Sequence, residues 1–290
     1  MFKEVLDYLD LKPGQIIVDA TIGTGGHSEG ILERILPGGR LIGIDRDQES
    51  LAFAKERLSR FGDAYEVVYG NFMYLDNILN DLGIKDIDGV LFDLGLSSFQ
   101  LQDSNRGFSF LSEGPLDMRF DRNSFICAYD LVNNLHEEEL SNLLWNFGQE
   151  RWHSRIARTL VKERQIRPIS TTSELVQIVL KAIPSRYRYQ HWRIHPATRT
   201  FQALRIAVNR ELEALETALE KAVKFLNKGS RICVISFHSL EDRIVKNSFR
   251  KFYSLGLIKI ITPKPLRPTL SELEENPSSR SGKLRVAERI

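Results

Sequence analysis

Four short apolar runs, separated by segments with helical periodicity, constrain the fold of this chain more than any other feature of its sequence. The runs are Ile16–Asp19, Arg40–Asp45, Tyr65–Tyr69 and Gly89–Asp93, and a fifth, Arg231–Phe237, follows much later. Such runs are typical of strands that are buried on both faces in a parallel sheet covered by helices. We therefore expect an α/β fold with a mainly parallel sheet, whose ligand site lies at the carboxyl ends of the strands.

The alternation of strands and helices stops after residue 100. The next hundred residues contain helical stretches, many Arg residues and no clear strand. We predict a discontinuous α/β domain formed by residues 1–102 and 201–290, with a helical domain inserted at 103–200. The aromatic residues Trp145, Phe147 and Trp152 are expected in the core of the inserted domain.

The last third of the chain returns to regular patterns. Apolar residues recur at helical spacing from Thr200 to Lys228 and predict one long helix, with Gly229 as its C-terminal stop. Ser239 is placed to cap the helix that follows the fifth strand. Residues 257–262 and 283–287 predict two antiparallel strands at the edge of the sheet.

Charge is distributed unevenly along the 290 residues, although the net charge is only +2. Residues 151–210 carry 13 Lys and Arg against 2 Asp and Glu, a net charge of +11. The other 230 residues carry 27 basic and 36 acidic residues, a net charge of −9. A basic segment on an acidic body predicts a local contact with a polyanion.

Several classes of protein do not fit this sequence. It has no run of about 18 apolar residues that would span a membrane, and its charged first ten residues do not form a signal peptide. Cys127 and Cys233 are too few for a disulfide framework or a four-cysteine zinc site. We expect a cytoplasmic protein without a structural metal.

A glycine-rich loop and an acidic residue indicate a nucleoside cofactor. The loop, Gly23-Thr-Gly25-Gly26-His27, follows the first expected strand, where glycine lets a ligand approach the backbone. Asp45 ends the second strand, 22 residues after Gly23, where an acid can accept hydrogen bonds from both ribose hydroxyls of an adenosine.

NAD and S-adenosyl-L-methionine both bind sites of this layout. The loop lacks the third glycine of Gly-x-Gly-x-x-Gly, because Ser28 stands there. Asp19 could lie near the ammonium of a methionine and would repel a pyrophosphate. These two features favour S-adenosyl-L-methionine.

The fourth strand ends in Asp93-Leu-Gly-Leu-Ser97, which would face the methyl group and its acceptor. The exocyclic amine of a base is a poor nucleophile, because its lone pair is delocalised into the ring. An acceptor that hydrogen-bonds the amine N–H can localise that pair, and Asp93, Ser97 or a loop carbonyl could provide it. His238, between the fifth strand and a helix, is a further catalytic candidate or a capping residue.

Eight motifs make the chain similar to a known family. They are residues 19–28 (DATIGTGGHS), 43–47 (GIDRD), 70–72 (GNF), 93–101 (DLGLSSFQL), 106–110 (RGFSF), 114–119 (GPLDMR), 195–205 (HPATRTFQALR) and 235–243 (ISFHSLEDR). Together they resemble the bacterial 16S rRNA cytosine-N4 methyltransferase family, also called the MraW or RsmH family.

The resemblance implies a class I, Rossmann-like methyltransferase core with an inserted helical domain. It implies methyl transfer from S-adenosyl-L-methionine to N4 of a cytidine in the decoding region of the small ribosomal subunit. The cofactor contacts of the family map onto Gly25, Gly26, His27, Asp45, Phe72, Asp93 and Gln100, with Phe72 against the adenine. The Asp/Asn-Pro-Pro-Tyr loop of other amino-group methyltransferases is replaced here by Asp93-Leu-Gly-Leu, so the group that handles the proton stays open.

The basic insert is the expected site of RNA contact. Arg186-Tyr-Arg188-Tyr-Gln-His-Trp192-Arg193 interleaves cations, which neutralise phosphates, with aromatic rings, which stack on unpaired bases. The alternative is a solvated helical face. The sequence carries no signal for oligomeric state and is compatible with a homodimer.

Two other functions use the same features. A nicotinamide dehydrogenase could use the same sheet, but the missing third glycine and the basic insert disfavour it. A non-catalytic RNA-binding or assembly factor could keep the cofactor fold, and only a measurement of activity distinguishes it from an rRNA methyltransferase.

Overall fold

The computed structural model describes residues 1–188 and 194–290 and divides the chain into two compact units. The first unit combines residues 1–95 and 212–290, and the second is the continuous stretch 96–211. The second unit is longer than the predicted insert at both ends. Leu96 at one end and Phe201 and Leu204 at the other pack into its hydrophobic core.

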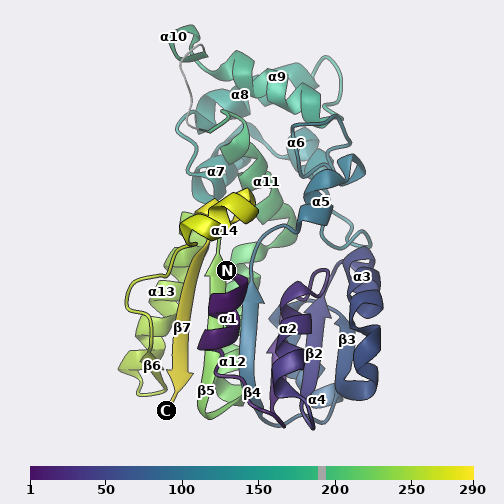
Figure 1. Ribbon diagram of the computed structural model, residues 1–290. Helices are drawn as coiled ribbons and strands as arrows, with labels where there is room; N and C mark the ends of the chain where they lie inside the picture. Colours follow the sequence, from purple (N-terminus) through teal and green to yellow (C-terminus); the bar gives the residue numbers. More distant parts are fainter. Residues whose placement is uncertain (189–193) are drawn as a thin grey trace. The chain divides into compact units, whose positions relative to one another are not determined.

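The first unit contains a seven-stranded sheet with the order β3-β2-β1-β4-β5-β7-β6 (Figure 1). Its strands are β1 (Ile16–Asp19), β2 (Arg40–Asp45), β3 (Tyr65–Tyr69), β4 (Ile87–Asp93), β5 (Leu226–Ser236), β6 (Ile258–Ile260) and β7 (Lys283–Arg289). The first five strands pair in parallel, whereas β7 runs antiparallel to β5 and β6. The predictions of a mainly parallel sheet and of an antiparallel edge are confirmed.

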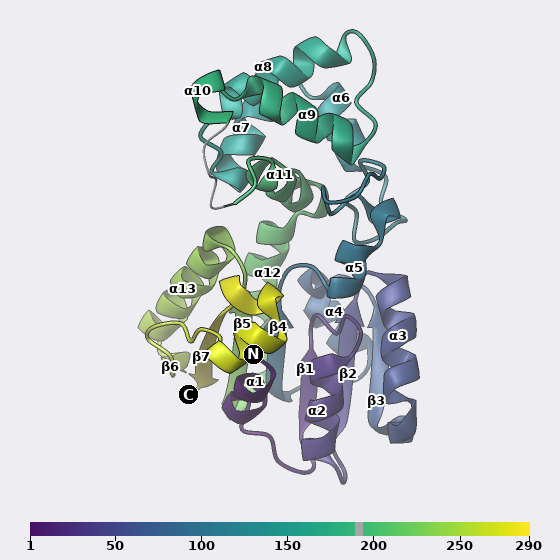
Figure 2. The same cartoon turned by 45° about the horizontal axis from the view of Figure 1, so that its top comes forward.

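Helices cover both faces of this sheet, as its apolar strands require. They are α1 (Phe2–Tyr8), α2 (Gly26–Ile35), α3 (Gln48–Leu58), α4 (Leu75–Asp81), α12 (Glu211–Phe225) and α13 (Ser239–Ser254). A further short helix, α14 (Leu270–Glu275), contacts the N-terminus, where Glu272 pairs with the amino group of Met1. Ile17 and Leu41 pack in a cluster with side chains of α1, α2 and α3. Their neighbours Val18 and Ile42 pack instead in a cluster with α4, α12 and α13. Helix α12 lies on the other side of the sheet from α1 and α2 (Figure 2).

The second unit is helical. Its helices are α5 (Ser98–Gln102), α6 (Ala128–Asn134), α7 (Glu137–Gly148), α8 (His153–Arg164), α9 (Thr172–Ala182), α10 (Ser185–Arg188) and α11 (Thr198–Asn209). Phe147 and Trp152 pack against its core as predicted, but Trp145 is 54% exposed, so the expectation that Trp145 is buried is wrong. The indole of Trp145 instead contacts the ring of His153 at the surface, 5.2 Å between centroids.

The predicted long helix at 200–228 is two helices. Arg210 adopts a left-handed conformation with a φ of 50° and separates α11 from α12. The side chain of Asn209 accepts a hydrogen bond from the N–H of Phe120 and donates to the carbonyl of Met118. Apolar periodicity continues across the break, so the pattern alone could not locate it.

The structure also corrects two predictions about helix ends, namely where the helix before β5 stops and which residue caps the helix after it. Gly229 does not stop a helix, because α12 already ends at Phe225 and Gly229 lies in β5, near an irregularity in its pairing with β4. Ser239 is the first residue of α13, and the preceding His238 is its N-cap. Among the described residues, no helix combines the length and apolar character that crossing a bilayer requires.

A glycine in the second unit offers a test of this fold. Gly107 has a φ of 66°, and a Cβ at this position would overlap the backbone oxygen of Pro115. Gly107→Ala is therefore expected to destabilise the protein by about 3 kcal/mol, the sum of the left-handed backbone penalty and the clash. Urea unfolding would measure the effect.

The matched control is Gly83→Ala. Gly83 has a similar φ of 69°, but no atom lies within 4 Å of the added Cβ. This variant is expected to lose only about 1 kcal/mol. Equal losses for both variants would contradict the close packing of Gly107 against Pro115.

Candidate active site

The carboxyl ends of β1, β2 and β4 lie along one edge of the sheet, where the strand order reverses between β1 and β4. Asp19 pairs with Gly43 on one side of β1 and with Leu91 on the other. Asp19, Asp45 and Asp93 end these three strands. Open parallel sheets bind ligands outside this edge, at such a reversal.

A tight turn joins β1 to α2. Gly25 has a φ of 82° and is the N-cap of α2, in a conformation that costs a residue with a Cβ about 1–2 kcal/mol. Its N–H donates to the carbonyl of Ile22 at 2.8 Å, and Gly26 begins the helix. Gly25 and Gly26 thus lie at the sheet edge where cofactor contacts were predicted, beside N–H groups that a helix start leaves free.

Asp19 supports this turn from within and is 1% exposed. One of its oxygens accepts a hydrogen bond from the hydroxyl of Ser28 at 2.7 Å, and the other accepts from the N–H of Thr21 at 3.3 Å. Burial raises the pKa of Asp19 to about 6. Because Asp19 is buried and both of its oxygens have donors, it stabilises the loop and is less available to a ligand than the sequence suggested.

Asp45 is fixed at the end of β2 by two backbone donors. Its Oδ2 accepts from the N–H of Gly23 at 2.9 Å, and its Oδ1 accepts from the N–H of Asp47 at 2.9 Å. Burial raises the pKa of Asp45, whereas these two hydrogen bonds lower it. Each carboxylate oxygen can accept a further hydrogen bond. A pair of vicinal hydroxyls, such as those of a ribose, matches this arrangement.

Phe72 begins a short 3-10 helix, η2 (Phe72–Tyr74), directly after β3. Its ring meets that of Phe92 edge-on, with centroids 5.7 Å apart, and the guanidinium of Arg46 lies 5.9 Å from its centroid. The side chain is only partly buried. An aromatic ring held in this way can stack on a planar heterocycle.

Asp93 and His27 face each other at the end of β4. His27 Nδ1 lies 3.4 Å from Asp93 Oδ2. Burial lowers the pKa of His27, so its imidazole is neutral near pH 7 and this contact is polar rather than ionic. The hydroxyl of Thr21 accepts a hydrogen bond from the N–H of Asp93 at 2.6 Å and links the end of β4 to the glycine loop.

The other polar atoms of these two residues have no partner. Asp93 Oδ1 and His27 Nε2 are shielded from solvent and make no hydrogen bond to the described residues. Burial raises the pKa of Asp93 to about 7. A buried polar atom without a partner costs about 1–3 kcal/mol, so natural proteins keep few of them outside functional sites.

Ser97 and Gln100 form a capping box at the start of α5. The hydroxyl of Ser97 accepts from the N–H of Gln100 at 3.2 Å, and the side-chain oxygen of Gln100 accepts from the N–H of Ser97 at 3.1 Å. Gln100 is 4% exposed. These hydrogen bonds give both residues a structural role at the start of α5. The catalytic role of Ser97 and the cofactor role of Gln100 stay predictions.

His238 is engaged in the same way at α13. Its Nδ1 accepts from the N–H of Glu241 at 3.3 Å. Its Nε2 lies 3.1 Å from a carboxylate oxygen of Glu241 but makes no hydrogen bond to the described residues. The other oxygen of Glu241 accepts from the N–H of Phe237 at 2.8 Å. Of the two readings of His238 that the sequence left open, this geometry favours the capping residue.

Comparisons with known proteins identify the family of this chain. The model of the MraW methylase family matches residues 1–290. The chain belongs to the MraW methylase family. Three relatives are each named ribosomal RNA small subunit methyltransferase H. They come from Geotalea uraniireducens (50% identical), Halothermothrix orenii (48%) and a Sulfurihydrogenibium species (49%), and the matches cover 100% of this chain and 97%, 97% and 98% of theirs.

Family membership confirms the class I methyltransferase fold, the enzymatic activity and S-adenosyl-L-methionine as cofactor. It also excludes the alternative that the chain is a nicotinamide dehydrogenase. The individual cofactor contacts are not tested by the comparisons. They stay predictions, which the geometry of Gly25, Asp45, Phe72 and Asp93 supports.

The predicted RNA-binding residues of the methylase are the least defined. Trp192 and Arg193 lie outside the described residues. Arg186 and Arg188 lie in α10, but the positions of their side chains are not described. All four stay predictions.

The sequence reasoning missed two residues that shape the methylase site. Thr21 accepts the hydrogen bond from Asp93, 72 residues away, and Arg46 packs over Phe72. Arg46 directly follows Asp45, the predicted ribose-binding acid, which is a signal that could have found it. Thr21 gives no such signal, because its hydrogen bond to Asp93 forms only when β4 lies beside the glycine loop.

Proposed function

We propose that this enzyme transfers a methyl group from S-adenosyl-L-methionine to N4 of a cytidine in the decoding region of 16S rRNA. The observation that carries the proposal is the shielded Oδ1 of Asp93, an acceptor without a partner at the edge where the cofactor residues converge. Curated relatives at about 50% identity bear the name of a small-subunit rRNA methyltransferase, which supports the substrate.

The residues at the sheet edge fit the parts of the cofactor. Asp45 would accept hydrogen bonds from the ribose hydroxyls, and Phe72 would pack on the adenine. Gly25 and Gly26 allow the methionine part to approach the backbone, beside His27. When bound, S-adenosyl-L-methionine supplies an electrophilic methyl group on a sulfonium.

Asp93 is the residue best suited to activate the amine. Its Oδ1 would accept one N–H of the cytosine amine and direct the nitrogen lone pair toward the methyl carbon, which in-line attack requires within about 3–3.5 Å. After transfer, the nitrogen carries a positive charge and a more acidic proton, which the carboxylate or water takes up. Ser97 and His238 would act indirectly, as the N-caps of α5 and α13.

The second unit would contact the rRNA. Ion pairs neutralise part of its charge, for example Lys181 with Glu163. The exposed guanidinium of Arg151 lies 4.8 Å from the ring centroid of Trp152 and 5.6 Å from that of Tyr187. A cation beside two aromatic rings can serve both a phosphate and a stacked base.

The experiment that tests the proposal is methyl transfer in vitro. Small subunits from cells that lack this gene are incubated with the enzyme and tritiated S-adenosyl-L-methionine, and the rRNA is then digested to nucleosides. N4-methylcytidine at a single position is the expected product. Binding of subunits without transfer would point instead to the non-catalytic assembly factor.

The pH dependence of the reaction should reflect Asp93. Only its ionised form is a strong acceptor, and its pKa is raised to about 7. We expect kcat/KM for S-adenosyl-L-methionine to rise about tenfold per pH unit below about 7 and to level off above it. The cationic cofactor stabilises the carboxylate, so the rise in kcat should lie at lower pH. If the same rise of kcat/KM with pH persists in Asp93→Asn, the group that titrates is not Asp93.

We also propose that the enzyme works in the cytoplasm, where it would meet small ribosomal subunits. The homodimer stays a prediction. Sedimentation of the purified protein at several concentrations would test it.

A further inference from the structure

A second basic segment lies in the first unit, outside the basic insert. Residues 243–267 contain seven Lys and Arg and no Asp or Glu. The overall net charge of +2 conceals this segment, because the rest of the first unit is acidic. Its residues come from α13, β6 and the loop after β6.

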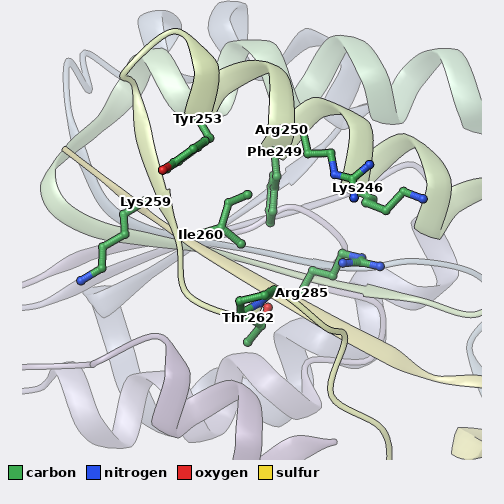
Figure 3. A pocket seen from close by; sticks show the side chains of 9 residues that line it. Lys246, Phe249, Arg250, Tyr253, Lys259, Ile260, Thr262 and Arg285 are labelled. Carbon is green, nitrogen blue, oxygen red and sulfur yellow. The ribbon is translucent and has the colours of Figure 1, made fainter.

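These residues surround a cavity of about 420 Å³ between α13 and the β6–β7 edge of the sheet (Figure 3). Lys246 and Arg250 reach it from α13, Lys259 from β6 and Arg285 from β7. Phe249, Ile260, Thr262 and Pro263 line it as well, together with Tyr253, which is 60% exposed. The lining thus combines four cations, an exposed phenol and no acidic side chain.

Three of the four cations form no ion pair with the residues that the structure describes. Arg285 donates to Asp242 at 2.7 Å, and Asp242 also pairs with Lys283. For Lys246, Arg250 and Lys259, in contrast, no carboxylate of the described part of the chain lies within ion-pair distance. Glu288 stands opposite Lys259 in the strand pairing but forms its ion pair with Arg231. Three cations without an ion pair around one cavity attract an anion with several charges.

The end of the basic segment lies next to a line of paired residues that crosses the sheet to Asp93. Leu266 bridges to Leu284, Leu284 pairs with Ile235, and Ile235 pairs with Asp93. Three inter-strand spacings of about 4.8 Å place Leu266 roughly 14 Å from Asp93. The exposed Lys264 and Arg267 flank Leu266.

We propose that the cavity between α13 and β6 binds phosphates of the RNA strand that carries the target base, and so positions that base at Asp93. This inference rests on the proposed rRNA substrate. An RNA strand that lies between the cavity and Asp93 would present its backbone phosphates at intervals, and these phosphates supply the several negative charges. Contacts of this kind fix the register of a strand and carry no sequence preference of their own.

The test is the triple variant Lys246→Gln, Arg250→Gln, Lys259→Gln. Its affinity for 16S rRNA is expected to fall at least about tenfold at moderate salt, and the slope of log affinity against log salt concentration should fall by about 2, because three phosphate contacts are lost. The KM for small subunits should rise in parallel. Affinity for S-adenosylhomocysteine should stay within about twofold of the parent, since none of the three residues lies at the cofactor edge.

The matched control is Lys85→Gln, Lys224→Gln, Lys228→Gln. It removes the same charge from exposed positions near the amino-terminal ends of β4 and β5. RNA affinity and salt slope should stay close to those of the parent protein. Equal losses in the two triple variants, or no loss in the first, would overturn the inference.

The two proposals can fail separately. If the parent protein methylates small subunits but the cavity variant binds and reacts like the control, the cavity proposal is wrong and the proposed function stands. If the parent protein transfers no methyl group while the cavity variant alone loses rRNA affinity, the proposed function is wrong and the cavity still binds RNA. If the cavity variant instead loses affinity only for vesicles of phosphatidylserine, the occupant is a membrane surface and the cavity proposal falls.

Discussion

Replacement of Asp93 by Asn is expected to lower kcat for methyl transfer about 1,000-fold, within the range that a positioned acid–base group contributes. Asn has nearly the same shape as Asp, so the packing around the end of β4 should persist. It loses the negative charge, so the one oxygen that it keeps is a weaker acceptor, and its amide nitrogen cannot accept the N–H of the amine. Single-turnover transfer from tritiated S-adenosyl-L-methionine to small subunits would measure the change.

The control for this prediction is His238→Asn. Asn is a good N-cap, and its side-chain oxygen can accept the hydrogen bond that the backbone N–H of Glu241 donates to His238. We expect this variant to keep kcat within about tenfold of the parent. Cofactor affinity, measured by calorimetry with S-adenosylhomocysteine, should show that Asp93→Asn still binds. If Asp93→Asn stays within tenfold of the parent, Asp93 is not the acceptor.

Asp45→Ala is expected to weaken binding of S-adenosyl-L-methionine about 100-fold or more. Two charge-assisted hydrogen bonds to the ribose would be lost, each contributing about 1.5–3 kcal/mol. The N–H groups of Gly23 and Asp47 would also lose their acceptor. The free protein should therefore unfold at lower denaturant concentration, and calorimetry with S-adenosylhomocysteine would give the loss in affinity.

Asp45→Asn separates the ligand contacts from the support of the loop. Asn keeps one acceptor oxygen and the shape of the side chain, so its affinity should lie between those of the parent and Asp45→Ala. Wild-type affinity in both variants would contradict the ribose contact.

Three acidic residues end neighbouring strands, and their surroundings give them different tasks. Asp19 is buried, and each of its oxygens accepts a hydrogen bond from the loop. Asp45 accepts one backbone hydrogen bond on each oxygen and can accept more. Only Asp93 keeps a shielded oxygen without a partner. Asp19 and Asp45 thus differ in burial, since Asp19 is 1% exposed and Asp45 is only partly buried. The ligand-directed roles predicted for Asp45 and Asp93 fit the acceptor capacity that each keeps.

Much of the fold could be predicted because local patterns report burial directly. The first three strands were predicted with the bounds observed, since an apolar run between turn residues reports a buried strand. The glycine turn and Asp45 could also be predicted, because their positions relative to β1 and β2 depend only on a short stretch of chain. The break at Arg210 could not, since Asn209 is tied to Phe120, 89 residues away.

The sequence by itself determined the α/β class, the family and the group of residues at the cofactor edge, because these depend on periodicity and on motifs within single segments. Only the tertiary structure decided which polar groups are free to act. His238 and Ser97 became helix caps and Asp93 retained an open acceptor, because hydrogen bonds between distant strands are formed only when the chain folds. The cavity lined by Lys246, Arg250 and Lys259 likewise exists only where α13 and β6 meet.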